Sequence, residues 1–522
     1  MATKRRRGVG ARWVAAVVAT LTVLAAVAVG GGLSDRAGAA PPARPNIVVI
    51  ITDDQTMAQL TEATMPRTLQ LIGGEGTTFA NAIATTPLCC PSRASMLTGQ
   101  YGHNNGVLAN RPGYGALTGK RNVLPAWLEG AGYRTAHVGR WLNGYRKQGP
   151  APGWDTWFTL GEHRTYFGYD VLTDDGEVRF GKRSKSYVTR VLNRAALGVT
   201  RRLVGGQRPF YLQLDHVAPH SDGIGGAQEG PCAHSAIPPS RTPAGFEGVP
   251  LPTVPSFDEE DITDKPPFLY PLPRIDEEDR AEFERQWRCR LASLPPVDEG
   301  LGRIYEVLAR SGELSNTAIF FISDNGFFFG EHRIRTEKYH PYEEAIRIPF
   351  LVRFPQILGP TASTIEDPVA NIDLPPTILE LAGATPCTRH RCRTLDGRSL
   401  LALAQGQAAW PERGLVVELD RLVGEPKTVL PCQYEGIRAG DQLYVEHSSL
   451  PNPATGVCEP GTAIEHYDLG DDPFELQNLF PSPPESAASL AQQRLSDRLA
   501  QLRDCAGIEG RDPAPESGHY CE

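Results

Sequence analysis

The stretch Asn46-Ile47-Val48-Val49-Ile50-Ile51-Thr52 is the clearest indication of the fold in this chain. Two carboxylates, Asp53 and Asp54, follow it directly. The five consecutive residues from Ile47 to Ile51 all have a branched β-carbon, which is typical of a β-strand. The run is uninterrupted rather than alternating, which indicates a strand buried on both faces. Such strands occur in parallel sheets that are covered by helices on both sides. The stretch therefore predicts an α/β fold with a large, mostly parallel central sheet.

Three further runs of the same kind follow along the chain, at 133–139, 209–214 and 317–323. Each run ends close to polar residues, which are Arg140, then Asp215, His216 and His220, and then Asp324 and Asn325. In open α/β sheets, ligands bind outside the carboxyl ends of the strands. We therefore expect a functional site at this edge of the sheet.

The remaining chain indicates how the molecule is divided. Helical stretches at 124–130 and 298–310 separate the predicted strands. The segment 220–273 is rich in Pro and Gly, which predicts a long insertion over the sheet. Beyond Cys387 shorter strands and turns follow, closed by a helix near 485–505. We expect a main α/β domain at 44–386 and a smaller antiparallel subdomain at 387–522.

A cysteine-containing motif lies between the first two predicted strands. It reads Pro87-Leu88-Cys89-Cys90-Pro91-Ser92-Arg93-Ala94-Ser95-Met96-Leu97-Thr98-Gly99. Pro91 suits the first turn of a helix, and the N-terminus of that helix would direct backbone N–H groups at Cys89. Arg93 adds a planar cation that suits a tetrahedral oxyanion. The motif predicts a nucleophile and an anion cradle; the alternative is two buried cysteines, or half of a disulfide, before an ordinary helix.

Four oxygen-bearing side chains at two predicted strand ends suggest a metal site. Asp53 and Asp54 follow the first strand, and Asp324 and Asn325 follow the run at 317–323. Oxygen ligands without a Cys/His cluster favour a hard cation, Ca²⁺ or Mg²⁺, over zinc. The alternative is local, since an Asp pair can cap a helix and Asp-Asn-Gly can form a turn.

The spacing C-x-P-S-R followed by L-T-G, which begins at Cys89, resembles the signature of the formylglycine-dependent sulfatases. The resemblance implies an alkaline-phosphatase-like sandwich in which Cys89 is oxidised to formylglycine by a formylglycine-generating enzyme. It also implies that Asp53, Asp54, Asp324 and Asn325, together with the modified Cys89, hold Ca²⁺ or Mg²⁺. By the same rule Cys90 only fills the variable position of the motif.

The resemblance extends over about residues 44–480 and covers two further cations. His220 in Ala218-Pro219-His220 and Lys338 in Glu337-Lys338-Tyr339 match residues that bind sulfate in the family. The residue-based alternatives are a structural histidine and a solvated surface lysine. The segments 86–93 and 141–145 look most like the N-acetylglucosamine-6-sulfatase and heparan endosulfatase branch, and 467–479 resembles the closing motif of the family.

One position departs from the family pattern. Most members have Gly-Lys after the second strand, whereas this chain has Gly139-Arg140, with Leu142 and Asn143 where many members have a histidine. Arginine keeps the positive charge, but it is larger and does not donate its proton. Arg140 is therefore expected to bind sulfate together with Arg93, His220 and Lys338.

The resemblance implies a sulfuric ester hydrolase that cleaves sulfate from an organic, carbohydrate or aryl, sulfate ester. The sequence leaves two alternatives to a sulfatase function. The first is a phosphate or phosphonate ester hydrolase of the related superfamily, although the Asp and His cluster of a second zinc site cannot be assembled here. The second is a non-catalytic carbohydrate-binding relative, which the Arg140 departure motivates.

The composition and the first residues indicate an exported protein. The formal net charge of −9 argues against nucleic acid as a partner. Five basic residues among the first twelve precede an uncharged apolar run at 13–33 and Ala37-Gly38-Ala39. This order predicts a signal peptide at 1–39 and secretion. The alternative is a retained membrane anchor, because the run is long for a signal peptide. The sequence predicts no oligomeric state.

The cysteines support export. Of the 10 Cys, eight remain when Cys89 and Cys90 are set aside, and an even number in an exported chain predicts disulfides. Closeness in sequence suggests the pairs Cys387–Cys392, Cys432–Cys458 and Cys505–Cys521, and Cys232–Cys289 follows by remainder.

Overall fold

The computed structural model describes most of the chain after the predicted signal peptide. The described residues are 44–145, 149–161, 165–222, 229–359, 361–389, 391–421, 427–481, 483–484 and 486–522. Residues Arg44–Glu522 form one compact unit. The predicted signal peptide at 1–39 and the apolar run at 13–33 lie outside the described residues, and no helix within them combines the length and apolar character needed to span a bilayer.

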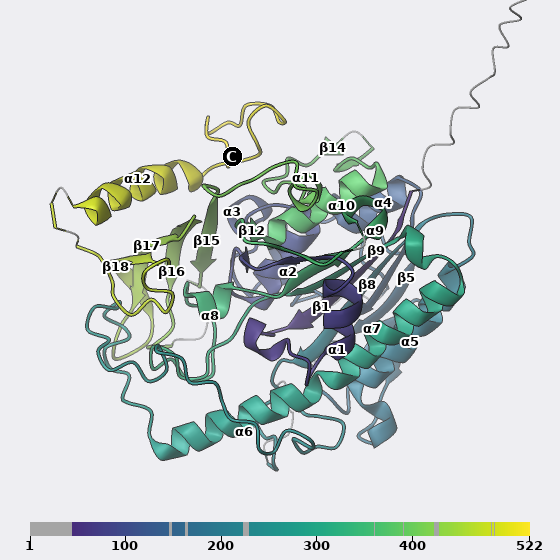
Figure 1. Ribbon diagram of the computed structural model, residues 1–522, viewed down its shortest axis with the longest axis horizontal. Coiled ribbons are helices and arrows are strands. Elements are labelled where there is room, and N and C mark those ends of the chain that lie inside the picture. The colour runs from purple at the N-terminus through teal and green to yellow at the C-terminus, as the bar shows by residue number, and fades with distance from the viewer. Residues whose placement is uncertain are drawn as a thin grey trace, which may run out of the picture. The chain divides into compact units, whose positions relative to one another are not determined.

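A ten-stranded sheet, in the order β11-β2-β10-β9-β1-β8-β4-β5-β6-β7, forms the centre of this unit (Figure 1). Its five central strands are parallel: β9 (Thr317–Ser323), β1 (Asn46–Asp53), β8 (Phe210–Pro219), β4 (Arg134–Gly139) and β5 (Thr156–Leu160). Antiparallel pairs extend it on both sides through β10 (Phe350–Arg353), β2 (Thr77–Phe79), β6 (Asp170–Thr173) and β7 (Gly176–Arg179), and β11 (Ser363–Ile365) adds a parallel edge. The predicted central sheet is confirmed.

Strand β1 is buried along its whole length, as its uninterrupted apolar sequence predicts. Val48 and Ile50 belong to one hydrophobic cluster, whereas Ile47, Val49 and Ile51 belong to another. Helices α5 (Val188–Leu203) and α7 (Pro295–Arg310) pack in the first cluster, and α2 (Cys89–Thr98), α4 (Leu124–Gly130) and α10 (Leu374–Ala382) pack in the second. Helices therefore cover both faces of the sheet (Figure 1).

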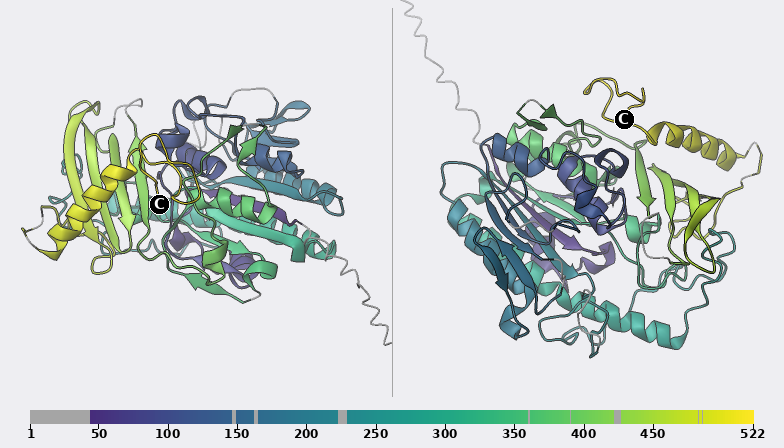
Figure 2. Two further views of the ribbon diagram at one scale, coloured as in Figure 1. Left: turned by 90° about the horizontal axis from the view of Figure 1, so that it is seen from above. Right: turned by 180° about the vertical axis from the view of Figure 1, so that it is seen from behind.

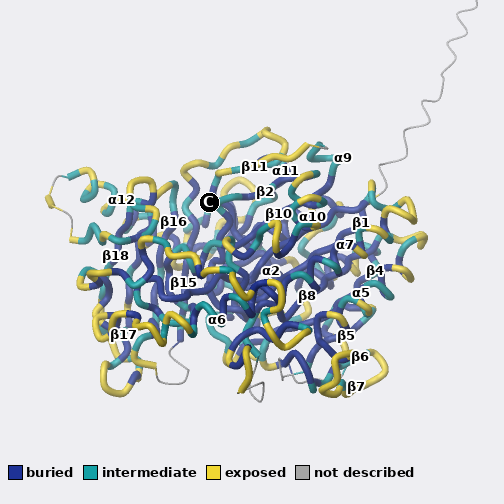
Figure 3. Tube along the Cα trace, turned by 60° about the horizontal axis from the view of Figure 1, so that its bottom comes forward, coloured by how far each residue is buried: buried dark blue, intermediate teal, exposed yellow. Residues whose placement is uncertain are grey.

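The observed boundaries agree closely with the predicted ones, with two informative differences. Strand β8 continues to Pro219, because its pairing with β1 extends past Asp215 to join Asp53 with Pro219 across an irregularity in register. Helix α2 begins at Cys89, two residues before Pro91, so the cysteine itself occupies the first turn. Strand β1 and helix α2 are buried, whereas exposed chain is concentrated in the loops and in edge strands such as β7 (Figure 3).

The segment between β8 and α6 (Glu277–Ser293) carries no helix or strand in its described part, 229–276. Its residues Phe246, Leu251 and Phe257 pack against α6 and against Phe329, which follows β9. The predicted insertion is therefore attached to the segment that follows β9. The remaining short elements are α1 (Pro66–Thr68), α3 (Gly102–Asn105), α8 (Glu343–Ile346), α9 (Pro355–Leu358), α11 (Leu401–Ala404), β3 (Ala82–Ile83), β12 (Val369–Ala370), β13 (Cys387–Thr388) and β14 (Arg391–Cys392).

A second, antiparallel sheet lies towards the C-terminus (Figure 2). Its strands are β15 (Gly414–Asp420), β16 (Gln433–Ala439), β17 (Gln442–Pro451) and β18 (Cys458–Asp468), and α12 (Ala487–Leu502) packs against it. Helix α12 is shorter than the predicted 485–505, and residue 485 lies outside the described part. The smaller antiparallel sheet is confirmed, whereas the domain boundary at 386/387 stays a prediction.

All four predicted disulfides are present. Their S–S distances are 1.99 Å, 2.08 Å, 1.98 Å and 2.08 Å for Cys232–Cys289, Cys387–Cys392, Cys432–Cys458 and Cys505–Cys521. Cys89 and Cys90 take part in none of them. The even set of eight was therefore correctly separated from the two cysteines of the motif.

Candidate active site

The carboxyl ends of four parallel strands bring the predicted site residues together. Thr52 of β1 lies beside Ser323 of β9 in the sheet register, so Asp53 and Asp324 follow at the same edge. The backbone N–H of Arg140, just after β4, donates to the Asp215 carbonyl of β8 at 2.9 Å. His220 follows β8 directly. Residues from four distant parts of the chain thus meet because their strands run in the same direction.

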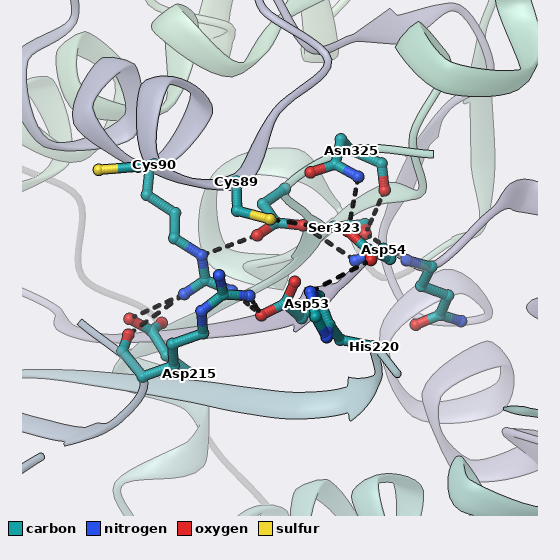
Figure 4. A network of polar contacts seen from close by, with 12 residues as sticks. Asp53, Asp54, Cys89, Cys90, Asp215, His220, Ser323 and Asn325 are labelled. Carbon is teal, nitrogen blue, oxygen red and sulfur yellow. Dashed lines mark hydrogen bonds and ion pairs between the residues drawn. The ribbon is translucent and has the colours of Figure 1, made fainter. Parts of the chain in front are cut away.

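The two adjacent cysteines face different surroundings (Figure 4). The Cys89 sulfur lies 3.8 Å from Asp54 Oδ1 and 3.4 Å from Lys338 Nζ. The Cys90 sulfur points away from these carboxylates and belongs to the hydrophobic core cluster that includes Leu97. Only Cys89 faces the polar site.

Each cation of the site is close to a carboxylate. Arg93 Nε donates to Asp324 Oδ2 at 2.7 Å, and its terminal nitrogens lie 3.5 Å from Asp53 and 3.5 Å from Asp215. Arg140 forms an ion pair with Asp53. These contacts place two guanidinium groups beside the carboxylates that end β1 and follow β9.

Lys338 forms the third pair, with Asp54. Burial alone would lower the pKa of Lys338, but the Asp54 carboxylate outweighs burial and raises the pKa above its usual value. Burial likewise opposes a charged Arg93, and Asp324 raises the pKa of that guanidinium. Both side chains therefore stay protonated at neutral pH.

His220 is the most accessible of the predicted catalytic residues. Its side chain is 15% exposed, compared with 7% for Lys338 and 2% for Arg140. Its Nδ1 lies 2.6 Å from the Ser221 carbonyl, so that nitrogen carries the proton in the neutral ring. Nε2 faces Asp54 Oδ2 at 3.7 Å.

The donor set fits a hard cation. Asp53, Asp54, Cys89 and His220 each offer a ligand atom, and these atoms lie within 4.8 Å of one another. Asp53 Oδ1 and Asn325 Oδ1 are buried and accept no hydrogen bond from the described residues, whereas Asp53 Oδ2 faces the guanidinium groups of Arg140 and Arg93. Buried oxygens without donors are costly unless a cation compensates them. The arrangement supports the predicted Ca²⁺ or Mg²⁺ ligands.

Hydrogen bonds with Asp54 connect Asp324 and Asn325 to this cluster of ligand atoms. The Asp54 N–H donates to Asp324 Oδ1 at 3.0 Å, and Asn325 Nδ2 donates to Asp54 Oδ1 at 2.7 Å. The four side chains that are predicted to offer oxygen ligands to the metal are therefore neighbours. Asp324 is also the partner of Arg93, so it links the cation ligands to the anion-binding arginine.

Arg290 of α6 supports the site but was not identified from the sequence. Its guanidinium donates to the carbonyl oxygen of Asp54 and lies 4.1 Å from the ring centroid of Phe327. Asp54 has a left-handed backbone, with φ of 64°, which Asp adopts more readily than most residues. Burial lowers the pKa of Arg290 to about 10. Nothing near Arg290 in the sequence signals this contact.

A second supporting group surrounds Asp215 of β8. His137 Nε2 lies 3.0 Å from Asp215 Oδ2, and Gln213 Nε2 donates to the same oxygen at 2.8 Å. Asp215 is also an ion-pair partner of Arg93. The sequence indicated Asp215 only as a polar residue near a strand end, since His137 of β4 and Arg93 of α2 lie far from it in the chain.

Comparisons with known proteins agree with this site. The Sulfatase family model matches residues 45–384. The N-acetylglucosamine-6-sulfatase of Homo sapiens is 31% identical over 519 residues, which covers 93% of this chain and 89% of that protein. The extracellular sulfatase SULF-1 homolog of Drosophila melanogaster is 31% identical over 389 residues, or 72% of this chain, and the chain spans only 33% of that protein.

Solved structures show the same fold. A protein solved in complex with its substrate D-glucosamine-2-N,6-O-disulfate superposes with a TM-score of 0.68 at 24% identity, covering 88% of this chain and 97% of that one. The comparisons do not favour the phosphate ester or non-catalytic alternatives. The family match covers more than half of the chain and includes the cysteine motif and all the strand ends described above. The chain belongs to the sulfatase family of enzymes.

Proposed function

We propose that the protein is a sulfuric ester hydrolase that uses a formylglycine formed from Cys89 and a divalent cation to release sulfate from an organic sulfate ester. One observation carries the proposal. The Cys89 sulfur, in the first turn of α2, lies 3.4 Å from Lys338 Nζ and 3.8 Å from Asp54 Oδ1, whereas Cys90 faces the core. The residue that is expected to be modified is thus the one that faces the cations and carboxylates.

The cations prepare the site for an anionic ester. Asp53, Asp54, Asp324 and Asn325 would hold Ca²⁺ or Mg²⁺, which supplies positive charge for the sulfate oxygens when it is bound. Arg93, Arg140 and Lys338 bring further positive charge to the same edge of the sheet. Neutralising the sulfate removes the repulsion between the ester and an approaching oxygen nucleophile.

Residue 89 and His220 divide the remaining chemistry. A hydrated formylglycine supplies two hydroxyl groups at position 89, one to attack sulfur and one to release the sulfate. Asp324, which follows β9 at this edge of the sheet, would take the proton of the attacking hydroxyl, and its hydrogen bonds from Arg93 and the Asp54 N–H orient the carboxylate. His220 in its doubly protonated form would donate the Nε2 proton to the leaving alcohol, while its Nδ1–H stays bonded to the Ser221 carbonyl.

A sulfated carbohydrate is the substrate class that the relatives favour. The human relative is an N-acetylglucosamine-6-sulfatase, and the solved neighbour carries a disulfated glucosamine as its substrate. We extend this substrate class to the present chain, with aryl sulfates as accessible smaller substrates. The four disulfides and an extracellular relative support secretion through the signal peptide.

The test is production with a formylglycine-generating enzyme, followed by peptide mass analysis and assays on aryl, monosaccharide and polysaccharide sulfates. We expect the mass of formylglycine at residue 89 and release of inorganic sulfate. A matched phosphate ester panel checks the leaving group. An intact thiol at position 89 in an active enzyme, or faster cleavage of phosphate esters, contradicts the proposal.

Metal removal is the second test. Dialysis against a chelator should remove most activity, and added Ca²⁺ or Mg²⁺ should restore it. Asp53→Ala should lower kcat by at least about a hundredfold, because the cation stabilises charge mainly in the transition state. Asp261→Ala, a change at an exposed carboxylate, serves as the control. Full activity of the metal-free protein would show that the carboxylates have another role.

A further inference from the structure

One part of this acidic chain is strongly basic. The segment 178–214 contains nine Lys and Arg residues and no Asp or Glu, although acids outnumber Lys and Arg by 61 to 52 in the whole chain. Six of these cations form what we call the basic strip: Lys182, Arg183, Lys185, Arg190, Arg194 and Arg201. All six are exposed, and none has an acidic partner within 4.0 Å among the described residues. Their charge is therefore available to a partner.

Helix α5 arranges part of the basic strip in a line. Arg190, Arg194 and Arg201 are separated by four and then seven positions, so they share one face of the helix. The opposite face, which includes Leu192, is buried on the sheet. The rise of a helix separates Arg190 from Arg201 by about 16 Å. Arg194 also donates to the Lys185 carbonyl at 3.0 Å, which joins the helix to the preceding loop.

The basic strip begins beside the active site. The Tyr166 hydroxyl donates to the His220 carbonyl at 2.8 Å, and the Tyr166 carbonyl accepts from the N–H of Val188, the first residue of α5, at 3.0 Å. The Tyr166 and Tyr187 rings stack with their centroids 5.8 Å apart. Tyr166 therefore joins the catalytic histidine to the start of α5.

The direction of α5 carries the strip away from the site. The helix precedes β8 in the chain and packs along that strand (Figure 1). Since β8 ends at the active-site edge, the first turn of α5 lies near that edge and the last turn lies near the opposite one. The cations thus extend from His220 across the outside of the sheet.

We propose that the basic strip binds a sulfated polysaccharide whose end or interior unit occupies the active site. The inference rests on the proposed function and specifies that its substrate is polymeric. A row of exposed cations on a protein of opposite net charge suits a linear polyanion, and guanidinium groups match the geometry of sulfate oxygens. A monosaccharide sulfate would reach only the catalytic residues and would not contact α5.

The test compares two double variants in a Cys89→Ala background, in which binding is measured without turnover. Arg190→Gln with Arg201→Gln removes two charges of the strip, and Arg310→Gln with Arg494→Gln removes two exposed helical arginines elsewhere. Glutamine keeps the helix propensity at all four positions. The probe is a heparin oligosaccharide of defined length, and its Kd is measured by titration calorimetry at several salt concentrations.

We expect the strip variant to weaken binding about tenfold and to reduce the slope of log Kd against log salt by about two, with less than a twofold effect in the control. In the active enzyme, the ratio of KM for the polymer to KM for an aryl sulfate should rise. Equal binding by both double variants would overturn the proposal, as would equally tight binding of duplex DNA. Because binding needs no turnover, its failure is distinct from a lack of sulfatase activity.

Discussion

Two neighbouring thiols at the start of α2 lie in different surroundings. Cys89 contacts Asp54 and Lys338, and Cys90 is fully buried among apolar side chains. A buried thiol without a nearby cation behaves as a small apolar residue. Position along the motif and position in the fold therefore select the same residue, Cys89, for chemistry.

Substitution of each thiol tests this assignment. Cys89→Ala should abolish sulfate ester hydrolysis, whereas Cys90→Ala should keep it and lower the free energy of unfolding by ~1 kcal/mol. Cys89→Ser should react once and remain sulfated, because serine has no second hydroxyl to release the sulfate. Activity assays and intact-protein mass spectrometry measure these outcomes. An inactive Cys90→Ala with a normal Cys89→Ala would show that the register is wrong.

Arg290 acts on the metal ligands from outside the site. It holds the carbonyl of Asp54, whose side chain contacts Cys89, Lys338 and Asn325. A hydrogen bond from a charged donor contributes about 1.5–3 kcal/mol. Its loss lets Asp54 leave the left-handed conformation that directs the carboxylate to the cation.

We therefore expect Arg290→Lys to raise the Ca²⁺ concentration that gives half-maximal activity by about tenfold, with kcat restored at saturating Ca²⁺. Arg288→Lys, on the same helix but paired with Glu284, is the matched control. A calcium titration of activity separates positioning from general damage. An unchanged calcium requirement in Arg290→Lys would mean that the contact does not position Asp54.

At the scale of elements, the segment after β9 positions Lys338. It is held by a buried group of acids and one histidine: His332 Nδ1 lies 2.7 Å from Glu259 Oε2, and the Ser256 hydroxyl donates to Glu344 Oε1 at 2.8 Å. Burial lowers the pKa of His332 by itself, but hydrogen bonds to Glu259 and Glu344 raise it to about 10. A charged histidine thus joins α8 to the insertion that precedes α6.

Glu331 gives this segment a pH dependence. Burial, reinforced by the charge of Glu344, raises the pKa of Glu331 to about 7 from the ordinary value of 4.5. Between these two values the folded protein binds more protons than the unfolded chain, so the free energy of unfolding falls as the pH rises through this window. The contribution is complete below pH 4.5 and is lost above about pH 7.

Glu331→Gln should remove this part of the pH dependence, because glutamine stays uncharged and still accepts a hydrogen bond from the Phe329 N–H. We expect the variant to exceed the wild type in stability by about 3 kcal/mol at about pH 8 and to match it at about pH 4. Denaturant unfolding in excess Ca²⁺ at both values measures the difference. A constant offset between the two proteins at all pH values would contradict the ionisation of Glu331.

At the scale of the whole molecule, the smaller sheet shares a hydrophobic cluster with segments of the main domain that lie outside the ten-stranded sheet. Ile83, Leu88 and Tyr101 belong to the same hydrophobic cluster as Leu415 and Tyr434 of β15 and β16. The Tyr434 hydroxyl also donates to the carbonyl of Tyr339, next to Lys338. The sheet that closes the chain therefore supports the loop that follows β9.

This shared core predicts that residues 44–386 do not fold alone. Removal of 387–522 would expose the apolar side chains around Leu88, directly before the catalytic cysteine. We expect the truncated protein to be insoluble, and limited proteolysis of the whole protein to release no stable C-terminal fragment. A soluble 44–386 fragment with cooperative unfolding would establish the boundary at 386/387 as one between independent domains.

Local patterns in the sequence were sufficient for the central strands, for the cysteine motif and for the residues at the strand ends. The run at 46–52 predicts a doubly covered strand because burial on both faces leaves no polar positions. Three of the disulfides join cysteines close in sequence, and the fourth pair followed because only two cysteines remained. Parallel strands also bring their carboxyl ends to one edge, so the assembly of Asp53, Arg140, His220 and Asp324 could be anticipated.

The pairing of the charged groups, and the residues that support them, could be identified only from the three-dimensional structure. Arg290 reaches Asp54 from 236 positions away, and His137 reaches Asp215 from a neighbouring strand. Such contacts depend on the packing of whole elements, because residues far apart in the chain meet only where helices and strands are placed together. The alignment of the basic strip with the active site has the same origin. The sequence shows that the cations exist, whereas the direction of α5 beside β8 determines where they lie relative to the active site.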